Sequence, residues 1–150
     1  QRGDAGRSAE DLYSNGLRAL QAKAYDEAAQ LFHLAADRGH ALAQHNYAMC
    51  NNRGMGVPLD FAQAARYSQL AADQGLVQAQ TLLAQSYLFG EGNAQDDAKA
   101  AHYYGLAADQ GLANAQHSYG FLVARGRGVP QDDAKAARYY RLAADQGFTS

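Results

Sequence analysis

Small apolar residues recur along this chain at the spacing of a helix. Alanines lie seven residues apart in three segments, and seven residues are two turns of an α-helix, so each pair lies on one face. A neighbouring helix can approach such a face closely, with leucine and tyrosine filling the remaining gaps. The alanine pairs are Ala64 and Ala71, Ala100 and Ala107, and Ala136 and Ala143. The expected gap-filling positions are Leu34, Leu70, Leu106 and Leu142; Leu31, Tyr67, Tyr103 and Tyr139; and Tyr47, Leu83 and Tyr119.

One string recurs with a fixed period. It reads LAADRG at 34–39 and LAADQG at 70–75, 106–111 and 142–147, so its final glycine returns every 36 residues. A period this regular indicates a repeat architecture, in which each repeat is one supersecondary unit that packs on its neighbours.

Each period predicts two helices. The first, called here the A-helix, begins at an aspartate that can cap its free N–H groups, and it ends at the recurring glycine, which can adopt a left-handed conformation. The second, the B-helix, must fold back antiparallel because the connection is short. The string Gly-x-Gly-Val-Pro-x-Asp at 54–60 and 126–132 then predicts a tight turn. The capping aspartates are Asp60, Asp96 and Asp132, and the B-helices end at Gly54, Gly90 and Gly126.

These signals predict about eight helices in one repeat domain, residues 9–147. A flexible tail is expected over 1–8 and a short tail over 148–150. Within the domain, an N-terminal capping helix at 9–23 precedes repeats at about 25–60, 61–96 and 97–132 and a partial repeat at 133–147.

The composition supports an all-α fold. The chain has 33 Ala and 16 Leu but only 4 Val and no Ile, so strand-forming residues are scarce. Thirteen basic and fifteen acidic residues leave a charge of −2, which argues against a nucleic-acid partner. No apolar stretch is long enough for a membrane span, and this chain shows no signal peptide, so a bacterial periplasmic or secreted location and a cytoplasmic one both stay open. The single Cys50 excludes an internal disulfide.

The pattern is clearest at 99–132: KAAHYYGLAADQG, then Ala-x-Ala-Gln, then Tyr-Gly, then GRGVPQD. It resembles the Sel-one-like repeat, a 36-residue relative of the tetratricopeptide repeat, and the resemblance covers about residues 9–147. The resemblance implies a right-handed α-solenoid of antiparallel helix hairpins with A-helices along a concave face. It also implies an adaptor that holds other proteins together. One cysteine-rich bacterial branch has a disulfide in each repeat, and this chain departs from it.

Two positions of the A-helix vary between copies that are otherwise nearly identical. Residues 97–111 and 133–147 match at 13 of 15 positions and differ only at His102/Arg138 and Gly105/Arg141. The two positions are three residues apart and share a helix face. Because their neighbours stay the same, we expect a surface whose residues a partner selects. The candidate partner-binding residues of the concave face are therefore Gln30, His33, Arg66, Gln69, His102, Arg138 and Arg141.

An aspartate stands near the end of every A-helix, where it opposes the helix dipole. A fixed partner is therefore expected, either Arg141 for Asp145 or a backbone N–H of the next helix. A structural hydrogen bond is favoured over contact with a ligand. The four positions are Asp37, Asp73, Asp109 and Asp145.

No catalytic residue, metal ligand or cofactor is expected. The Gly-x-Gly strings lack the preceding strand and the Lys-Ser/Thr of a phosphate loop, and the five histidines include no pair at helical ligand spacing. Cys50 corresponds to Ser86 and Leu122 in other copies, which favours a packing role over a nucleophile. Arg2-Gly3-Asp4 resembles the integrin-recognition tripeptide, but strings this short in a tail occur often by chance.

The leading hypothesis is a non-enzymatic interaction module that binds a peptide or helix of a partner protein, favouring an acidic segment. The alternative is a self-associating scaffold, or a fragment of a longer repeat regulator. Self-association would make a homo-oligomer through the C-terminal helix, where Tyr139, Tyr140 and Leu142 lack a covering helix. An enzyme is the third and least favoured hypothesis, because no catalytic cluster is evident.

Overall fold

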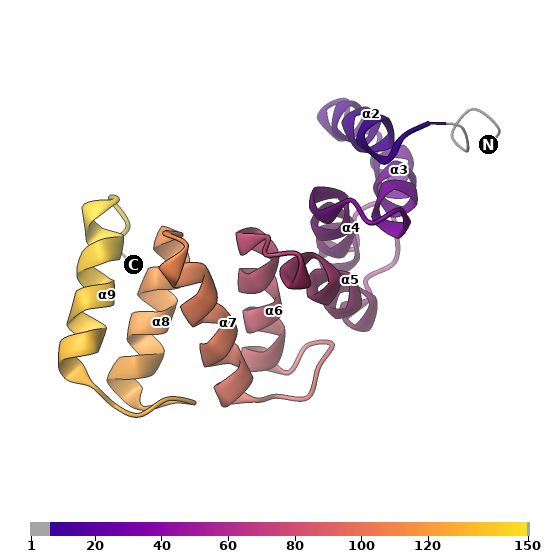
Figure 1. Ribbon diagram of the computed structural model, residues 1–150. Coiled ribbons are helices and arrows are strands. Elements are labelled where there is room, and N and C mark those ends of the chain that lie inside the picture. Colours follow the sequence, from indigo (N-terminus) through magenta and orange to yellow (C-terminus); the bar gives the residue numbers. More distant parts are fainter. Residues whose placement is uncertain (1–6, 150) are drawn as a thin grey trace. The chain divides into compact units, whose positions relative to one another are not determined.

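A computed structural model describes residues 7–149, and these residues form eight α-helices and no β-strand (Figure 1). The all-α repeat prediction is confirmed. The helices are α2 (Ala9–Gln21), α3 (Tyr25–Asp37), α4 (Ala41–Arg53), α5 (Phe61–Asp73), α6 (Val77–Phe89), α7 (Asp97–Asp109), α8 (Ala113–Arg125) and α9 (Asp133–Asp145). None of these helices has the length and apolar character that a membrane crossing requires. The Arg2-Gly3-Asp4 string and most of the expected tail over 1–8 lie outside the described residues, as does Ser150.

The A-helices α5, α7 and α9 begin where the sequence predicts. The carboxylates of Asp60, Asp96 and Asp132 each accept a hydrogen bond from the backbone N–H three residues later, at 3.0, 3.1 and 3.0 Å. These bonds satisfy donors that the helix itself leaves free. Each A-helix is followed by its glycine in a positive-φ conformation, with φ between 87° and 97° at Gly39, Gly75, Gly111 and Gly147. The predicted aspartate start and glycine end of the A-helices α5, α7 and α9 are therefore confirmed.

The second glycine of the closing turn is required by close packing. A Cβ atom on Gly56 would lie 2.2 Å from the carbonyl oxygen of Tyr25, and one on Gly128 would lie 2.1 Å from that of Asp97. Both glycines also have positive φ, 76° and 74°. The turns after α4 and α8 therefore press their backbone against the first residue of the preceding A-helix, and only glycine leaves room for it.

The chain divides into two compact units, an N-terminal unit of residues 1–76 and a C-terminal unit of residues 77–150. Each unit holds four helices in the order B, A, B, A, and each helix packs against the next one within its unit. In this order α2 takes the place of a B-helix.

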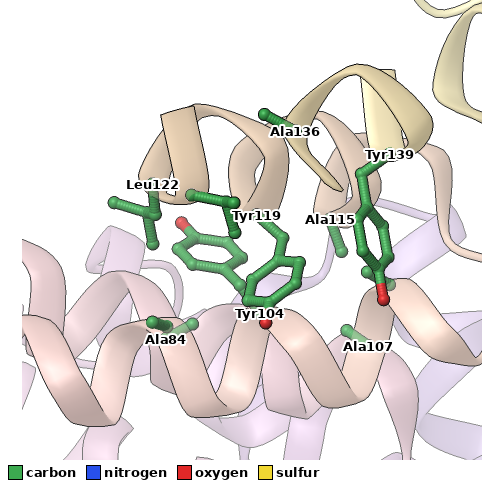
Figure 2. Close-up of a cluster of buried hydrophobic side chains, with 11 residues drawn as sticks. Ala84, Tyr104, Ala107, Ala115, Tyr119, Leu122, Ala136 and Tyr139 are labelled. Atoms are coloured by element: carbon green, nitrogen blue, oxygen red, sulfur yellow. The ribbon is translucent and has the colours of Figure 1, made fainter. Parts of the chain in front are cut away.

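Alanine and tyrosine make up most of the core of the C-terminal unit, together with Leu122 and Val123. Figure 2 shows Tyr104 and Tyr119 among alanines of neighbouring helices, including Ala84, Ala107 and Ala115. The rings of Tyr119 and Tyr139 meet edge to face with centroids 4.8 Å apart. In the N-terminal unit, Tyr47 and Tyr67 form the same pair at 4.8 Å. All four paired tyrosines are buried, which confirms their expected packing role.

Glutamines connect successive A-helices within each unit. The side-chain amide of Gln74 donates to the carbonyl oxygen of Gly39 at 3.0 Å and to Gln44 at 2.9 Å. Gln146 donates in the same way to Gly111 at 2.8 Å and to Gln116 at 2.9 Å. The end of one A-helix is thus bonded to the end of the A-helix before it, so neighbouring repeats keep a fixed register.

Candidate functional site

The first variable position of the A-helix is on the surface in every copy. Gln30, Arg66, His102 and Arg138 are all exposed. The guanidinium of Arg66 lies over the ring of Tyr67 at 5.1 Å, and that of Arg138 lies over Tyr139 at 5.5 Å. His102 meets Tyr103 edge to face at 5.0 Å. Each of these three side chains therefore rests on the aromatic ring of the next residue, which restricts its motion and leaves an edge facing solvent.

The second variable position is partly built into the packing, unlike the uniform surface expected from sequence. His33 stacks on Tyr47 with centroids 4.4 Å apart, and its Nε2 lies 3.2 Å from a carboxylate oxygen of Asp37. Gly105 is buried, and a Cβ there would lie 3.2 Å from the ring of Tyr119. Gln69 is half-buried and donates to Asp73 at 2.8 Å, whereas Arg141 is exposed. In α3 and α7 this position therefore faces the tyrosine of the following B-helix, an arrangement that comparison of the repeats does not predict.

The aspartate column is held by tyrosine. The hydroxyl of Tyr67 donates to Asp37 and that of Tyr139 donates to Asp109, both at 2.7 Å. The expected structural hydrogen bond is thus present at these two aspartates, but its donor is a tyrosine of the next A-helix instead of an arginine or a backbone N–H. Burial and the neighbouring carboxylate raise the pKa of Tyr67 to about 12 and also raise that of Tyr139.

The leucine column does not fill gaps in the core, and that expectation is wrong. Leu70, Leu106 and Leu142 are 45%, 40% and 42% exposed, and Leu34 is only half-buried. Each leucine follows the first variable position by four residues, so the two share one side of the helix. The alanines and tyrosines already close the space between helices, which leaves the leucines at the surface beside Arg66, His102 and Arg138.

These side chains form a pocket in the N-terminal unit. Arg66, Tyr67 and Leu70 of α5 face the end of α3, around an open cavity of about 650 Å³. This Arg66 pocket is lined by Ala36, Asp37, Gly39, Gln44, Arg66, Tyr67 and Leu70. It brings together a cation, an apolar side chain and a carboxylate that already accepts two bonds. Of the seven predicted partner-binding residues, only Arg66 lines it.

Among residues 7–149, cysteine and metal-ligating side chains form no cluster beside the A-helix arginines. Cys50 is 1% exposed, and burial raises its pKa to about 11, so its expected packing role is confirmed. Across residues 7–149 there is no group of three or more His, Cys, Asp or Glu side chains arranged to hold a metal ion. A guanidinium stacked on a ring and a neighbouring leucine can receive a carboxylate and an apolar side chain.

Comparison with known proteins identifies the repeat. Residues 6–40, 41–76, 77–112 and 113–148 match the sequence profile of the Sel1 repeat. The chain is similar to a protective antigen present in uropathogenic Escherichia coli strains, which displays an SLR fold, with 34% identity and a TM-score of 0.91 over 98% of this chain and 32% of that one. It is also similar to a Sel1 repeat protein from Oxalobacter formigenes, with 29% identity and a TM-score of 0.85 over 91% of this chain and 55% of the other.

A third solved structure shares the fold alone. Helicobacter pylori cysteine rich protein B is 20% identical, with a TM-score of 0.57 over 95% of this chain and 92% of that protein. The chain spans about a third and about half of the two more similar structures. No curated protein sequence matches it.

Proposed function

Because this chain belongs to the Sel1 repeat family, whose fold is generally a non-catalytic interaction scaffold, we propose that it binds an acidic segment of a partner protein on the exposed side of its A-helices. Arginines at the first variable position receive carboxylates of that segment. The neighbouring leucines contact its apolar side chains.

The observation that carries this proposal is the combination of exposure and variation at one position. Gln30, Arg66, His102 and Arg138 are all exposed, while the alanines and tyrosines around them keep the packing of the helix. A residue that packing does not select is free to be selected by a ligand. Arginine suits a carboxylate because its planar fork can donate two parallel hydrogen bonds.

The test uses an array of end-blocked peptides of about ten residues that vary the number and spacing of Asp, Glu and Leu. We expect wild-type protein to bind acidic members, and we expect raised salt to weaken the binding. In the double variant Arg66→Ala with Arg138→Ala, affinity should fall by about tenfold or more, which corresponds to about 1.4 kcal/mol. Fluorescence anisotropy measures the affinity, and circular dichroism checks that helicity is unchanged.

Two controls separate the proposed surface from general charge. Arg53→Ala with Arg125→Ala removes two exposed arginines from the ends of B-helices and should leave affinity unchanged. Peptides with Lys in place of Asp and Glu should not bind. Equal affinity of wild type and the Arg66/Arg138 variant for every acidic peptide would remove the A-helix surface from the proposal.

Pairing of two copies through α9 is a second candidate. Ala137 and Ala144 of α9 are exposed, whereas their counterparts Ala101 and Ala108 in α7 are 1% and 2% exposed because α8 covers them. A second copy could cover the same face of α9. Sedimentation at several concentrations tests this, since a molecular mass that stays monomeric throughout would exclude pairing.

A further inference from the structure

The Arg66 pocket has a second copy in the sequence. Each of its seven residues has an identical residue 72 positions later, in the C-terminal unit. The counterparts are Ala108, Asp109, Gly111, Gln116, Arg138, Tyr139 and Leu142. This set is called here the Arg138 site.

The two sets also make the same contacts. Tyrosine donates to aspartate at 2.7 Å in both. Gln44 donates to the carbonyl oxygen of Ala36 at 3.2 Å, and Gln116 donates to that of Ala108 at 3.3 Å. Both arginines lie over their tyrosine rings, at 5.1 and 5.5 Å, and Leu70 and Leu142 are exposed to nearly the same extent, 45% and 42%. These contacts are therefore shared by the two units. The Arg66 pocket has two further contacts, from Arg66 to Gln63 at 2.8 Å and between His33 and Asp37 at 3.2 Å. The residues 72 positions after Gln63 and His33 are Lys135 and Gly105.

Packing alone does not account for both arginines. The repeat between them keeps the same residue types at the other six positions, Ala72, Asp73, Gly75, Gln80, Tyr103 and Leu106, but has His102 in place of arginine. The first A-helix has Gln30 there. Since all four side chains are exposed, the helix accepts different residues at this position. The helix therefore does not require the arginine that occurs in two of its four copies.

We infer that the protein carries one binding site twice, as the Arg66 pocket and the Arg138 site. The partner that fits these two sites best is a protein chain with two copies of a short motif, in which a leucine is flanked by acidic residues. This inference rests on the proposed function and specifies its partner. Each site receives one carboxylate on its arginine and one apolar side chain against its leucine. Two linked motifs bind more tightly than one because the second binding event is intramolecular.

The first experiment counts sites. The probe is the tightest-binding single-motif peptide from the array described above, titrated into the full chain by isothermal titration calorimetry. We expect two peptides per chain for wild type, one for Arg66→Ala, one for Arg138→Ala and none for the double variant. Arg53→Ala and Arg125→Ala are the matched controls and should keep two. One peptide per wild-type chain would overturn the inference while leaving the proposed function intact.

The second experiment joins two copies of the same peptide by Gly-Ser linkers of graded length. With wild type, at least one linker length should bind about a hundredfold more tightly than the single motif, with one tandem peptide per chain. Arg66→Ala or Arg138→Ala should each abolish this gain. Two sites without a gain at any length would overturn the two-motif partner. If no acidic peptide in the array binds, the proposed function itself fails.

Discussion

The N-terminal and C-terminal units contain the same four helices in the same order, yet they differ beside their central tyrosine pair. His33 in α3 stacks on Tyr47, whereas Gly105 in α7 lets the ring of Tyr119 lie directly against the helix. The tyrosine pairs nevertheless keep the same centroid separation of 4.8 Å in both units. The pair therefore sets the helix spacing, and the neighbouring position adapts to it.

This comparison separates contacts that both units share from contacts that one unit has alone. The closing-turn glycines, the tyrosine–aspartate bonds and the glutamine links occur in both. The His33 stack occurs in the N-terminal unit, and the Arg127–Asp97 ion pair occurs in the C-terminal unit. Changing a shared contact should cost the two units similar stability, and changing an unshared one should affect its own unit.

The largest loss is expected from the closing turns. Gly56→Ala and Gly128→Ala should each lower the free energy of unfolding by about 3 kcal/mol or more, because the added methyl group overlaps a backbone carbonyl and the residue has positive φ. Urea denaturation followed by circular dichroism measures both variants. Similar losses in the two units are expected from their similar geometry.

Gly75→Ala is the matched control for these variants. Its φ is 88°, but no atom lies within 4 Å of the added Cβ. It should therefore cost only the conformational penalty of roughly 1–2 kcal/mol. A loss in Gly75→Ala as large as in Gly56→Ala would show that close packing is not what the turn glycine provides.

The next largest effect is expected at the position where the units differ. His33→Gly gives the N-terminal unit the residue of the C-terminal one, and should destabilise by about 1.5 kcal/mol through a glycine within a helix and the lost ring contact. His33→Ala should recover about 1 kcal/mol of this, because it restores helix propensity without the ring. Thermal unfolding measures both variants. Equal stability of His33→Gly and His33→Ala would contradict the contribution of helix propensity at this position.

A smaller effect is expected from the tyrosine hydroxyls. Tyr139→Phe should destabilise by about 1 kcal/mol through loss of the bond to Asp109. Tyr67→Phe should cost less, because Asp37 keeps His33 as a second partner at 3.2 Å. Urea denaturation of both variants tests the order. In a His33→Gly background the cost of Tyr67→Phe should rise to that of Tyr139→Phe, and an unchanged cost would argue against this role of His33.

The smallest effect is expected from Arg127→Met, which introduces the residue found at Met55 in the N-terminal unit. Hydrogen bonds from Arg127 hold the pKa of Asp97 below its usual 3.8. A lowered pKa stabilises the folded state above the usual pKa, and that contribution disappears as the pH falls through the lowered value. When the pH is lowered from 5, the variant should therefore lose less stability than wild type. Urea denaturation at a series of pH values measures this difference. An unchanged pH dependence of stability would show that Arg127 does not lower the pKa of Asp97.

Much of the fold was predictable because its signals are local. Asp60, Asp96 and Asp132 cap their own helices within three residues, and Gly39 and its counterparts end theirs by a backbone conformation. The candidate site was less predictable. The first variable position is exposed as expected, but the sequence predicts Leu70 in the core and does not identify the partner of Asp37. The environment of both side chains depends on residues of other helices, which a local pattern does not reveal.

The helices, their boundaries and the 36-residue repeat follow from the sequence, because capping, helix propensity and glycine conformation act within a few residues of the chain. Contacts between helices, in contrast, select which apolar side chains remain exposed and which donors reach Asp37 and Asp109. Those outcomes depend on contacts across about 30 residues, such as Tyr67 to Asp37 and Tyr139 to Asp109. Alanine, tyrosine and a few larger side chains such as Phe32, Leu83 and Leu122 fill the space between neighbouring helices, and the leucines beside the arginines stay exposed.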